Sequence, residues 1–152
     1  MTSYSENRRA FFDYEILEKF EAGIELKGFE VKSVKLGRMN LAGCFAVPRG
    51  ASRGGAELWL LNADIPPYQP NNTPADYDSK RSRRLLLKSE EIKYLLGKIK
   101  SANLTLVPLR VYNKRGLVKL ELGLGKPKKK GDKRETIRKR EAKREISRTL
   151  KK

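Results

Sequence analysis

The amino-acid sequence predicts a mainly β fold with flanking helices, followed by a basic C-terminal tail. Short segments of alternating apolar and polar residues recur through the first 125 residues, separated by loops rich in glycine and proline. These segments show no strand–helix–strand rhythm of the kind that builds a parallel sheet. The pattern therefore favours a small antiparallel barrel or sandwich, and the residues alone leave both open.

Five segments have the apolar spacing or composition of strands: residues 11–26, 41–47, 57–65, 104–111 and 117–124. The second and third are expected to form a hairpin across a Gly-rich loop, and the fourth and fifth a hairpin around an Asn-Lys-Arg-Gly turn. In the last segment, valine and three leucines alternate with lysine, glutamate and glycine. Such alternation is typical of an antiparallel sheet with one buried face and one wet face.

Two further segments predict helices, and a third predicts a loop. Residues 28–36 carry two valines three positions apart, and Gly37 is placed to end the helix. Ser89 is expected to cap the second helix, whose apolar residues follow helical spacing: Ile92, Leu95, Leu96 and Ile99. Residues 66–84 contain four prolines and end in Lys-Arg-Ser-Arg-Arg, so we expect an extended basic loop there.

Positive charge divides the chain into a body, residues 1–125, and a tail, residues 126–152. The chain has 35 Lys and Arg against 18 Asp and Glu, a net charge of +17, of which +10 lies in the tail. Residues 132–152 have helical propensity but few apolar side chains, so we expect a tail that is disordered when free and folds against a charged partner. Such charge favours nucleic acid over an anionic membrane, because the tail lacks the broad apolar face of an interfacial helix.

Missing residue types exclude several chemistries. The chain has no histidine, which excludes Ser-His-Asp catalysis and histidine metal sites. Its single cysteine, Cys44, excludes an internal disulfide and is expected in the core. The acids Asp64, Asp76 and Asp78 lack the spacing of a metal-dependent nuclease. We therefore predict no catalytic residue, metal or cofactor. The absence of an apolar leader or span predicts a cytoplasmic protein, and we expect it to be a monomer.

Basic runs near tyrosines favour RNA among the possible polyanions. The basic residues gather at Arg8–Arg9, in residues 80–84 and along the tail, while Tyr68 and Tyr77 lie in or near a loop. Aromatic rings beside cationic grooves suit the unstacked bases of structured or single-stranded RNA. Taken singly, most of these residues are better explained as solvated surface; the summed charge favours nucleic acid.

Several motifs occur in an order and spacing similar to those of one protein family. They are Asp13–Glu18, Phe20–Ile24, Gly28–Ser33, Gly37–Leu41, Arg83–Leu87 and Asp132–Glu135. Together, from about Asn7 to the C-terminus, they resemble the small protein B family, the SsrA-binding proteins of bacterial trans-translation. The resemblance implies an oligonucleotide-binding-fold (OB-like) antiparallel barrel. It also implies a non-catalytic protein that binds transfer-messenger RNA and, with elongation factor Tu and GTP, delivers it to stalled ribosomes.

The resemblance also implies particular site residues in the body and in the tail. RNA-binding positions of the family fall on Asn7, Glu21, Leu86 and Lys119. The basic runs add Arg8, Arg83 and Arg84 as candidates, and Lys32 in the Gly28–Ser33 motif is a further one. Leu86 has the alternative of being a core residue. The tail would occupy the empty decoding centre and mRNA channel of the small ribosomal subunit, through Asp132, Lys133 and Arg134 with Lys128, Lys129 and Lys130.

The chain departs from the family pattern at three places. Gly131 stands where the family usually has a histidine or aromatic residue, residues 78–84 lack the usual proline, and the loop at 48–55 is longer. Two alternatives remain open. A ribosomal or assembly protein would sediment stoichiometrically with subunits, and an RNA-processing enzyme would turn over its substrate.

Overall fold

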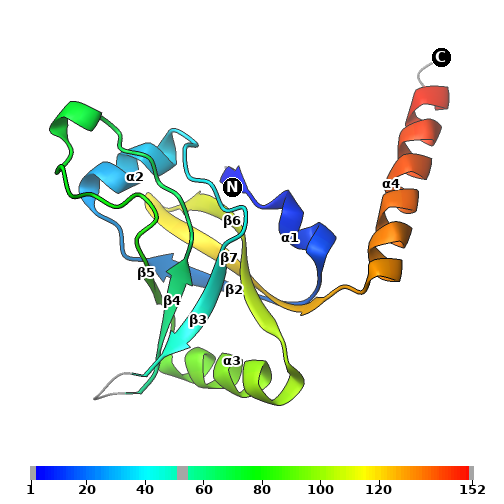
Figure 1. Cartoon of the computed structure of the whole chain (residues 1–152), viewed down its shortest axis with the longest axis horizontal. Coiled ribbons are helices and arrows are strands. Elements are labelled where there is room, and N and C mark those ends of the chain that lie inside the picture. Colours follow the sequence, from blue (N-terminus) through cyan, green and yellow to red (C-terminus); the bar gives the residue numbers. More distant parts are fainter. Residues whose placement is uncertain (1–2, 51–54, 151–152) are drawn as a thin grey trace.

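The computed structural model describes residues 3–50 and 55–150, apart from the side chains of residues 130, 132, 136 and 145–150. Its elements are β1 Ser3–Glu6, α1 Arg8–Asp13, β2 Tyr14–Ile24, α2 Gly28–Lys35, β3 Phe45–Arg49, β4 Glu57–Leu61, the 3-10 turn η1 Pro70–Asn72, β5 Arg83–Leu86, α3 Ser89–Ala102, β6 Thr105–Lys114, β7 Leu117–Pro127 and α4 Lys130–Leu150. Figure 1 labels the helices and strands along the chain.

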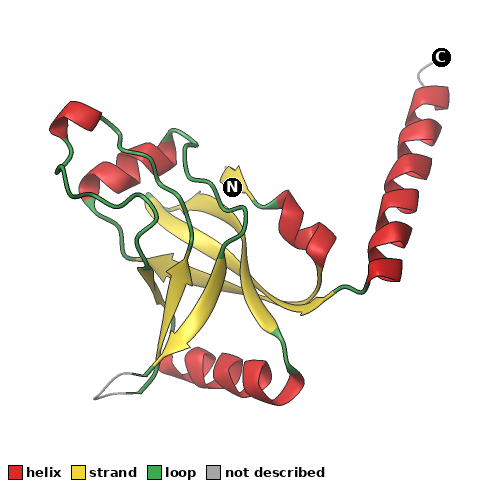
Figure 2. Ribbon diagram, viewed as in Figure 1, coloured by secondary structure: helices red, strands yellow, loops and turns green. Residues whose placement is uncertain are grey.

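The strands form one antiparallel sheet that closes on itself. Within the described residues the strand order is β1-β6-β3-β4-β5-β2-β7, and pairing of β6 with β7 closes the ring. Figure 2 shows α1, α2 and α3 around this barrel, while α4 projects away from it. The structure thus confirms the mainly β class and selects the OB-like barrel over the sandwich.

The barrel interior is filled by apolar side chains from alternate strand positions. In β7, Leu120, Leu122 and Leu124 are each at most 1% exposed. Val34 of α2 and Leu95 of α3 join the same cluster, so both helices are fixed to the barrel by burial of their apolar faces. Cys44 is buried as predicted, and this burial raises the pKa of its thiol to about 12. The thiol is therefore protonated at neutral pH.

The predicted boundaries near the N-terminus are wrong in two respects. The alternation from Phe11 led us to expect a strand, but residues 11–13 belong to α1, which follows a short strand, β1, that the sequence did not reveal. The Asn7 side chain caps α1 by accepting a hydrogen bond from the Ala10 N–H at 3.3 Å. The strand after α1 then ends at Ile24, before Leu26.

Other elements shift by a few residues. β3 begins at Phe45, so Cys44 precedes it, and β4 ends at Leu61, where Asn62 adopts a positive φ of 68°. The turn of the second hairpin is tighter than predicted, because Arg115 and Gly116 both have positive φ, as a two-residue type I′ turn requires. Ser89 is the first residue of α3 and not its cap, which is Lys88.

A buried ion cluster holds the Pro-rich loop against α2. Glu30 of α2 accepts hydrogen bonds from Arg83 Nη2 at 2.6 Å, from Arg81 and from the Tyr77 hydroxyl at 3.0 Å. The Glu30 and Arg83 side chains are both fully buried. Arg83 lies in β5, a strand that the sequence did not predict, and also donates to the carbonyls of Ala63 and Ser79. The expected basic loop therefore turns two of its arginines inward.

The pKa of Glu30 shows that this cluster stabilises the charged carboxylate. Burial alone raises the pKa, but hydrogen bonds from Arg81, the Lys27 N–H and Arg83 outweigh that effect and lower it to about 2. Because the folded-state pKa lies below the ordinary value of 4.5, the stabilisation is complete above that value and is lost as the pH falls toward 2.

We predict that Glu30→Gln lowers the free energy of unfolding by about 3–5 kcal/mol at pH 7, because Arg83 is left buried without its counter-charge. Chemical denaturation measures this loss. The difference from the unsubstituted protein should shrink as the pH falls below about 4.5. The matched control is Glu25→Gln, since the Glu25 side chain is 54% exposed. Equal effects of the two substitutions would contradict the assignment.

Candidate nucleic-acid interface

The outward-facing side chains of β2, β7 and β6 form one surface, which we call the outer face. Strand register sets Glu21 of β2 opposite Glu121 of β7, and Glu121 opposite Arg110 of β6. One row further along, Gly23 and Tyr112 flank Lys119 in the same way. Lys119 lies outside the barrel as predicted from the alternation, because its neighbours Val118 and Leu120 face the core cluster.

Glu21 presents an ionised carboxylate on the outer face. The Tyr112 hydroxyl donates to it, and Lys114 Nζ lies 3.0 Å from Oε1. These two hydrogen bonds, Tyr112 first, lower the pKa of Glu21. Like charges directly across a sheet repel, but Lys114 offsets Glu21 and Arg110 offsets Glu121 at 3.4 Å. The carboxylate stays 37% exposed, so it can accept hydrogen bonds from a partner.

A groove beside Glu21 joins apolar and basic groups. It encloses about 270 Å³ and is lined by Gly23, Ile24, Leu26, Val31, Leu86, Gly116, Leu117, Val118 and Lys119. Leu86 is 45% exposed while its neighbour Leu85 is 1% exposed, so Leu86 is a surface residue and the core alternative is wrong. A side chain at Gly23 would meet Leu86 Cβ at 3.2 Å, so glycine there leaves room for the Leu86 side chain on the paired strand β5.

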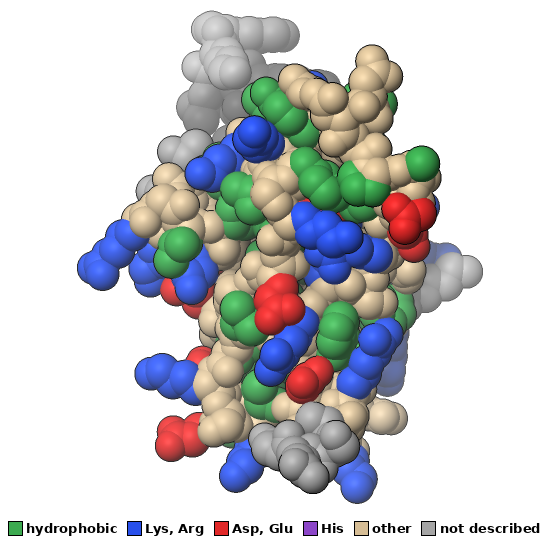
Figure 3. All heavy atoms as spheres, turned by 90° about the vertical axis from the view of Figure 1, so that its left-hand side faces the viewer, with side chains coloured by type: hydrophobic (Ala, Val, Ile, Leu, Met, Phe, Trp, Pro, Cys, Tyr) green, Lys and Arg blue, Asp and Glu red, His purple; other side chains and the backbone are tan. Residues whose placement is uncertain are grey.

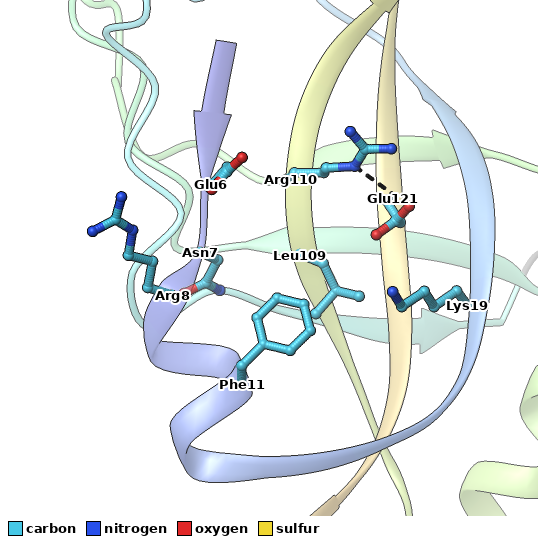
Figure 4. Close-up of a pocket in the computed structure, with 8 residues that line it drawn as sticks. All are labelled: Glu6, Asn7, Arg8, Phe11, Lys19, Leu109, Arg110 and Glu121. Carbon is cyan, nitrogen blue, oxygen red and sulfur yellow. Dashed lines mark hydrogen bonds and ion pairs between the residues drawn. The ribbon is translucent and has the colours of Figure 1, made fainter. Parts of the chain in front are cut away.

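A second cavity lies where α1 meets the outer face. It encloses about 330 Å³ and is lined by Glu6, Asn7, Arg8, Phe11, Lys19, Leu109, Arg110 and Glu121 (Figure 4). The Asn7 side chain is engaged within the protein, since its Nδ2 donates to the Pro108 carbonyl at 2.8 Å and its Oδ1 caps α1. Asn7 is only 6% exposed, so its geometry suits positioning of Arg8 and Phe11 better than direct contact.

The remaining predicted body residues lie apart from the outer face. Lys32 is exposed on α2, with Nζ 5.6 Å from the Tyr68 ring centroid, and Arg84 lies 3.7 Å from Glu25 and 3.6 Å from Glu57. Arg83 is fully buried against Glu30, so the prediction that it contacts RNA is corrected. On the face shown in Figure 3, Lys and Arg are interspersed with apolar and acidic side chains and form no unbroken basic patch.

The base of the tail is joined to α1. Strand β7 runs to Pro127, past the predicted boundary at residue 126, and the Lys128 N–H donates to the Asp13 carbonyl at 2.9 Å. Lys133 Nζ lies 3.3 Å from Asp13 Oδ1, and the cationic groups of Lys133 and Arg140 lie 5.8 and 5.7 Å from the Phe12 ring centroid. These contacts orient α4 relative to the body.

The other predicted tail residues differ in what the structure describes. Arg134 and Lys129 are exposed. The side chains of Lys130 and Asp132 lie outside the described residues, so the expected roles of these two side chains stay predictions. Gly131 lies within α4, where an added Cβ meets no described atom within 4 Å.

Five residues of the outer face and of the cavity beside α1 were not among the sequence-based candidates: Phe11 of α1, Lys19, Arg110, Lys114, and Tyr112, which is 2% exposed. Lys19 and Arg110 occupy outward positions of predicted strands, which is the one signal that pointed to them. Their convergence depends on the pairing of β2, β7 and β6. Among the described side chains there is no group of three or more potential metal ligands, and no helix in the described ranges is long and apolar enough to cross a membrane.

Comparison with known proteins shows similarity over nearly the whole chain. The family model described as SmpB protein matches residues 4–152. An SsrA-binding protein of Synechococcus elongatus is 50% identical, covering 97% of this chain and 92% of the relative. One of Carboxydothermus hydrogenoformans is 51% identical, covering 96% and 94%. A solved chain described as "tmRNA-SmpB: a journey to the center of the bacterial ribosome" is 47% identical with a TM-score of 0.64, covering 88% and 93%.

We predict that Asp13→Asn loosens the joint between α1 and α4. Burial alone raises the pKa of Asp13, but hydrogen bonds from Arg9 and Lys133 outweigh it and lower the pKa, so the carboxylate is charged at neutral pH. Distances between one spin label on α4 and one on β4 should spread more widely in the variant. Glu15→Gln, on the exposed Glu15 nearby, is the control. An unchanged distance distribution in Asp13→Asn would show that the Asp13–Lys133 pair does not orient α4.

Proposed function

The chain belongs to the SmpB protein family, and we propose on this basis that it binds transfer-messenger RNA (SsrA RNA) and delivers it to stalled ribosomes for trans-translation. The observation that carries the proposal is the match over residues 4–152 to a family whose named relatives are SsrA-binding proteins. The similar solved chain is described with tmRNA and the bacterial ribosome. Elongation factor Tu with GTP would join through the RNA.

The outer face supplies chemistry that suits a folded RNA. Lys19 and Lys119 offer ammonium groups to phosphates, which supply affinity without reading sequence. Glu21 offers an ionised acceptor, which binds the amino groups of bases or ribose hydroxyls and repels phosphate. The apolar groove at Leu86 offers van der Waals contact to sugar and base faces. The face therefore combines phosphate binding with groups that discriminate among RNA surfaces.

The tail supplies a second, separate surface. As a helix of 21 residues, α4 spans about 30 Å and carries exposed basic residues such as Arg134 and Arg138. Its main contacts with the described body are with α1, and most of its length projects away from the barrel (Figure 1). We propose that α4 enters the empty decoding centre and mRNA channel, where ribosomal RNA phosphates replace Asp13 as the partner of Lys133.

The protein acts in this proposal as a cytoplasmic, monomeric adaptor without catalysis of its own. Incubation of RNA with excess protein and Mg²⁺ tests the enzyme alternative, which requires cleavage. Sedimentation tests the ribosomal-protein alternative, which requires stoichiometric presence on every ribosome. The adaptor should join stalled ribosomes only together with transfer-messenger RNA, and pull-down followed by sequencing should recover that RNA.

We predict that Glu21→Ala and Lys119→Ala each weaken binding of transfer-messenger RNA by about tenfold, the effect of losing a charged contact worth about 1–3 kcal/mol. Filter binding at fixed salt measures the Kd. The matched controls are Glu25→Ala and Lys35→Ala, which remove the same charges from exposed positions outside the outer face. If the controls weaken binding as much, net charge explains the affinity and the outer face does not.

For the tail we predict that RNA binding is kept and ribosome rescue is lost. Deletion of residues 130–152 should leave the Kd for transfer-messenger RNA within about threefold, since electrostatic attraction from the tail is partly screened by salt, and should abolish ribosome rescue. The deletion begins at Lys130, because a start at the predicted boundary of residue 126 would cut β7, which pairs with β2 as far as Pro127. A reconstituted trans-translation assay reads out rescue. A tail deletion that destroys RNA affinity would contradict the division of labour.

A further inference from the structure

We propose that the cavity between α1 and the outer face binds one unpaired nucleobase of the bound RNA, an inference that rests on the proposed function. With about 330 Å³ it has the size of a small-molecule site. In Figure 4 the Phe11 ring and the Leu109 side chain line its floor, Lys19 lies at one side, and Arg110 and Glu121 lie above. The cavity therefore has an apolar floor with charged groups around it.

The Phe11 ring is available for stacking. It is 42% exposed and belongs to neither apolar cluster of the core, although Leu109 in the same cavity is 1% exposed. Lys19 Nζ lies 5.9 Å from the ring centroid, where it attracts the π electrons. The adjacent ring of Phe12, by contrast, is contacted by the tail residues Lys133 and Arg140. An exposed ring with a cation beside it is a typical platform for an unstacked base.

The polar groups of the cavity select the class of base. Glu121 is a carboxylate acceptor that shares one contact, at 3.4 Å, with Arg110. A carboxylate accepts from ring N–H and amino groups, and guanine presents two such donors side by side on its Watson–Crick edge. Arg110 can donate at the same time to the adjacent guanine carbonyl. Uracil offers a single donor between two carbonyls, so guanine complements this pair of side chains better.

Charge and position connect the cavity to the rest of the proposed RNA surface. Arg8 and Lys19 are exposed around it and can hold the phosphates on either side of the inserted base. Lys19 and Glu21 occupy outward positions two residues apart on β2, so the cavity continues the outer face without a break. Asn7 fixes α1 to β6, which holds Phe11 in place before RNA binds.

The test uses the full chain with 4-fluorophenylalanine at position 11, titrated with transfer-messenger RNA and followed by fluorine NMR. Stacking should shift the fluorine resonance at saturation, because the ring current of the base acts on it. The same label at position 12 is the matched control and should shift less. Phe11→Ala should weaken binding about tenfold, and Phe11→Trp should restore it. Glu121→Gln should reduce the preference for guanine over inosine, which lacks the amino group, at the nucleotide whose base occupies the cavity.

The outcomes separate the cavity from the proposed function. If the protein does not prefer transfer-messenger RNA, the proposed function fails, and the titration is repeated with a random single-stranded RNA pool at low salt. A shift at position 11 there upholds the nucleobase site. An unshifted resonance at position 11 with saturating RNA, or a Phe11→Ala variant that folds and binds as tightly as the unsubstituted protein, would overturn it.

Discussion

The pairing of β7 with both β2 and β6 is the constraint on which the rest of the structure depends. It closes the barrel, and it determines which side chains face the core and which face solvent. Leu120, Leu122 and Leu124 fill the interior. Lys119 and Glu121, at the alternate positions of β7, face outward and form part of the outer face. A slip of one residue would exchange the two sets. The core and the proposed RNA surface are therefore two consequences of one register.

Glycine lets the same strands pack closely at the α1 end of the outer face. A Cβ at Gly123 would lie 3.0 Å from Leu109 Cδ1 and 3.1 Å from Ile16 Cγ2, and one at Gly125 would lie 3.0 Å from Tyr14 Cβ. Larger residues would push these side chains away from the sheet. The position of Leu109 in the floor of the cavity thus depends on glycine at position 123.

Charge serves two purposes in this protein. Around Glu30, ionised groups are buried and hold the Pro-rich loop to α2, where breaking one pair is costly. On the outer face and in α4, charged side chains such as Lys19 and Arg134 are exposed and contribute little to stability, so they are available to a polyanion. A high net charge alone does not distinguish these uses. The two uses are distinguished by the partner of each charged side chain.

Local pattern was sufficient for much of the fold. The regular alternation at 117–124 predicted β7, and the spacing of Ile92, Leu95 and Leu96 predicted α3 within one residue of its start. β5 was missed because Arg83 looks like surface in a basic run. Its burial depends on Glu30, 53 residues earlier in the chain, and no local pattern reports such a partner.

The candidate site was predicted in part, and from a different kind of information. Glu21 and Leu86 came from family resemblance, since neither periodicity nor charge distinguishes them. Phe11 was overlooked because the two-residue spacing of Phe12, Tyr14 and Ile16 suggested that residues 11–26 form a strand. Asn7 caps the helix that contains Phe11, but from the sequence Asn7 was assigned only to RNA binding. Phe11, Lys19 and Arg110 converge through tertiary pairing alone.

The central claim is that the outer face binds transfer-messenger RNA while α4 stays free for the ribosome. Lysine reactivity, measured by mass spectrometry on the full chain with and without that RNA, tests it most directly. We expect Lys19 and Lys119 to lose reactivity in the complex, while Lys139 and Lys143, exposed on α4, keep it. Protection of the α4 lysines with Lys19 and Lys119 still reactive would contradict the account.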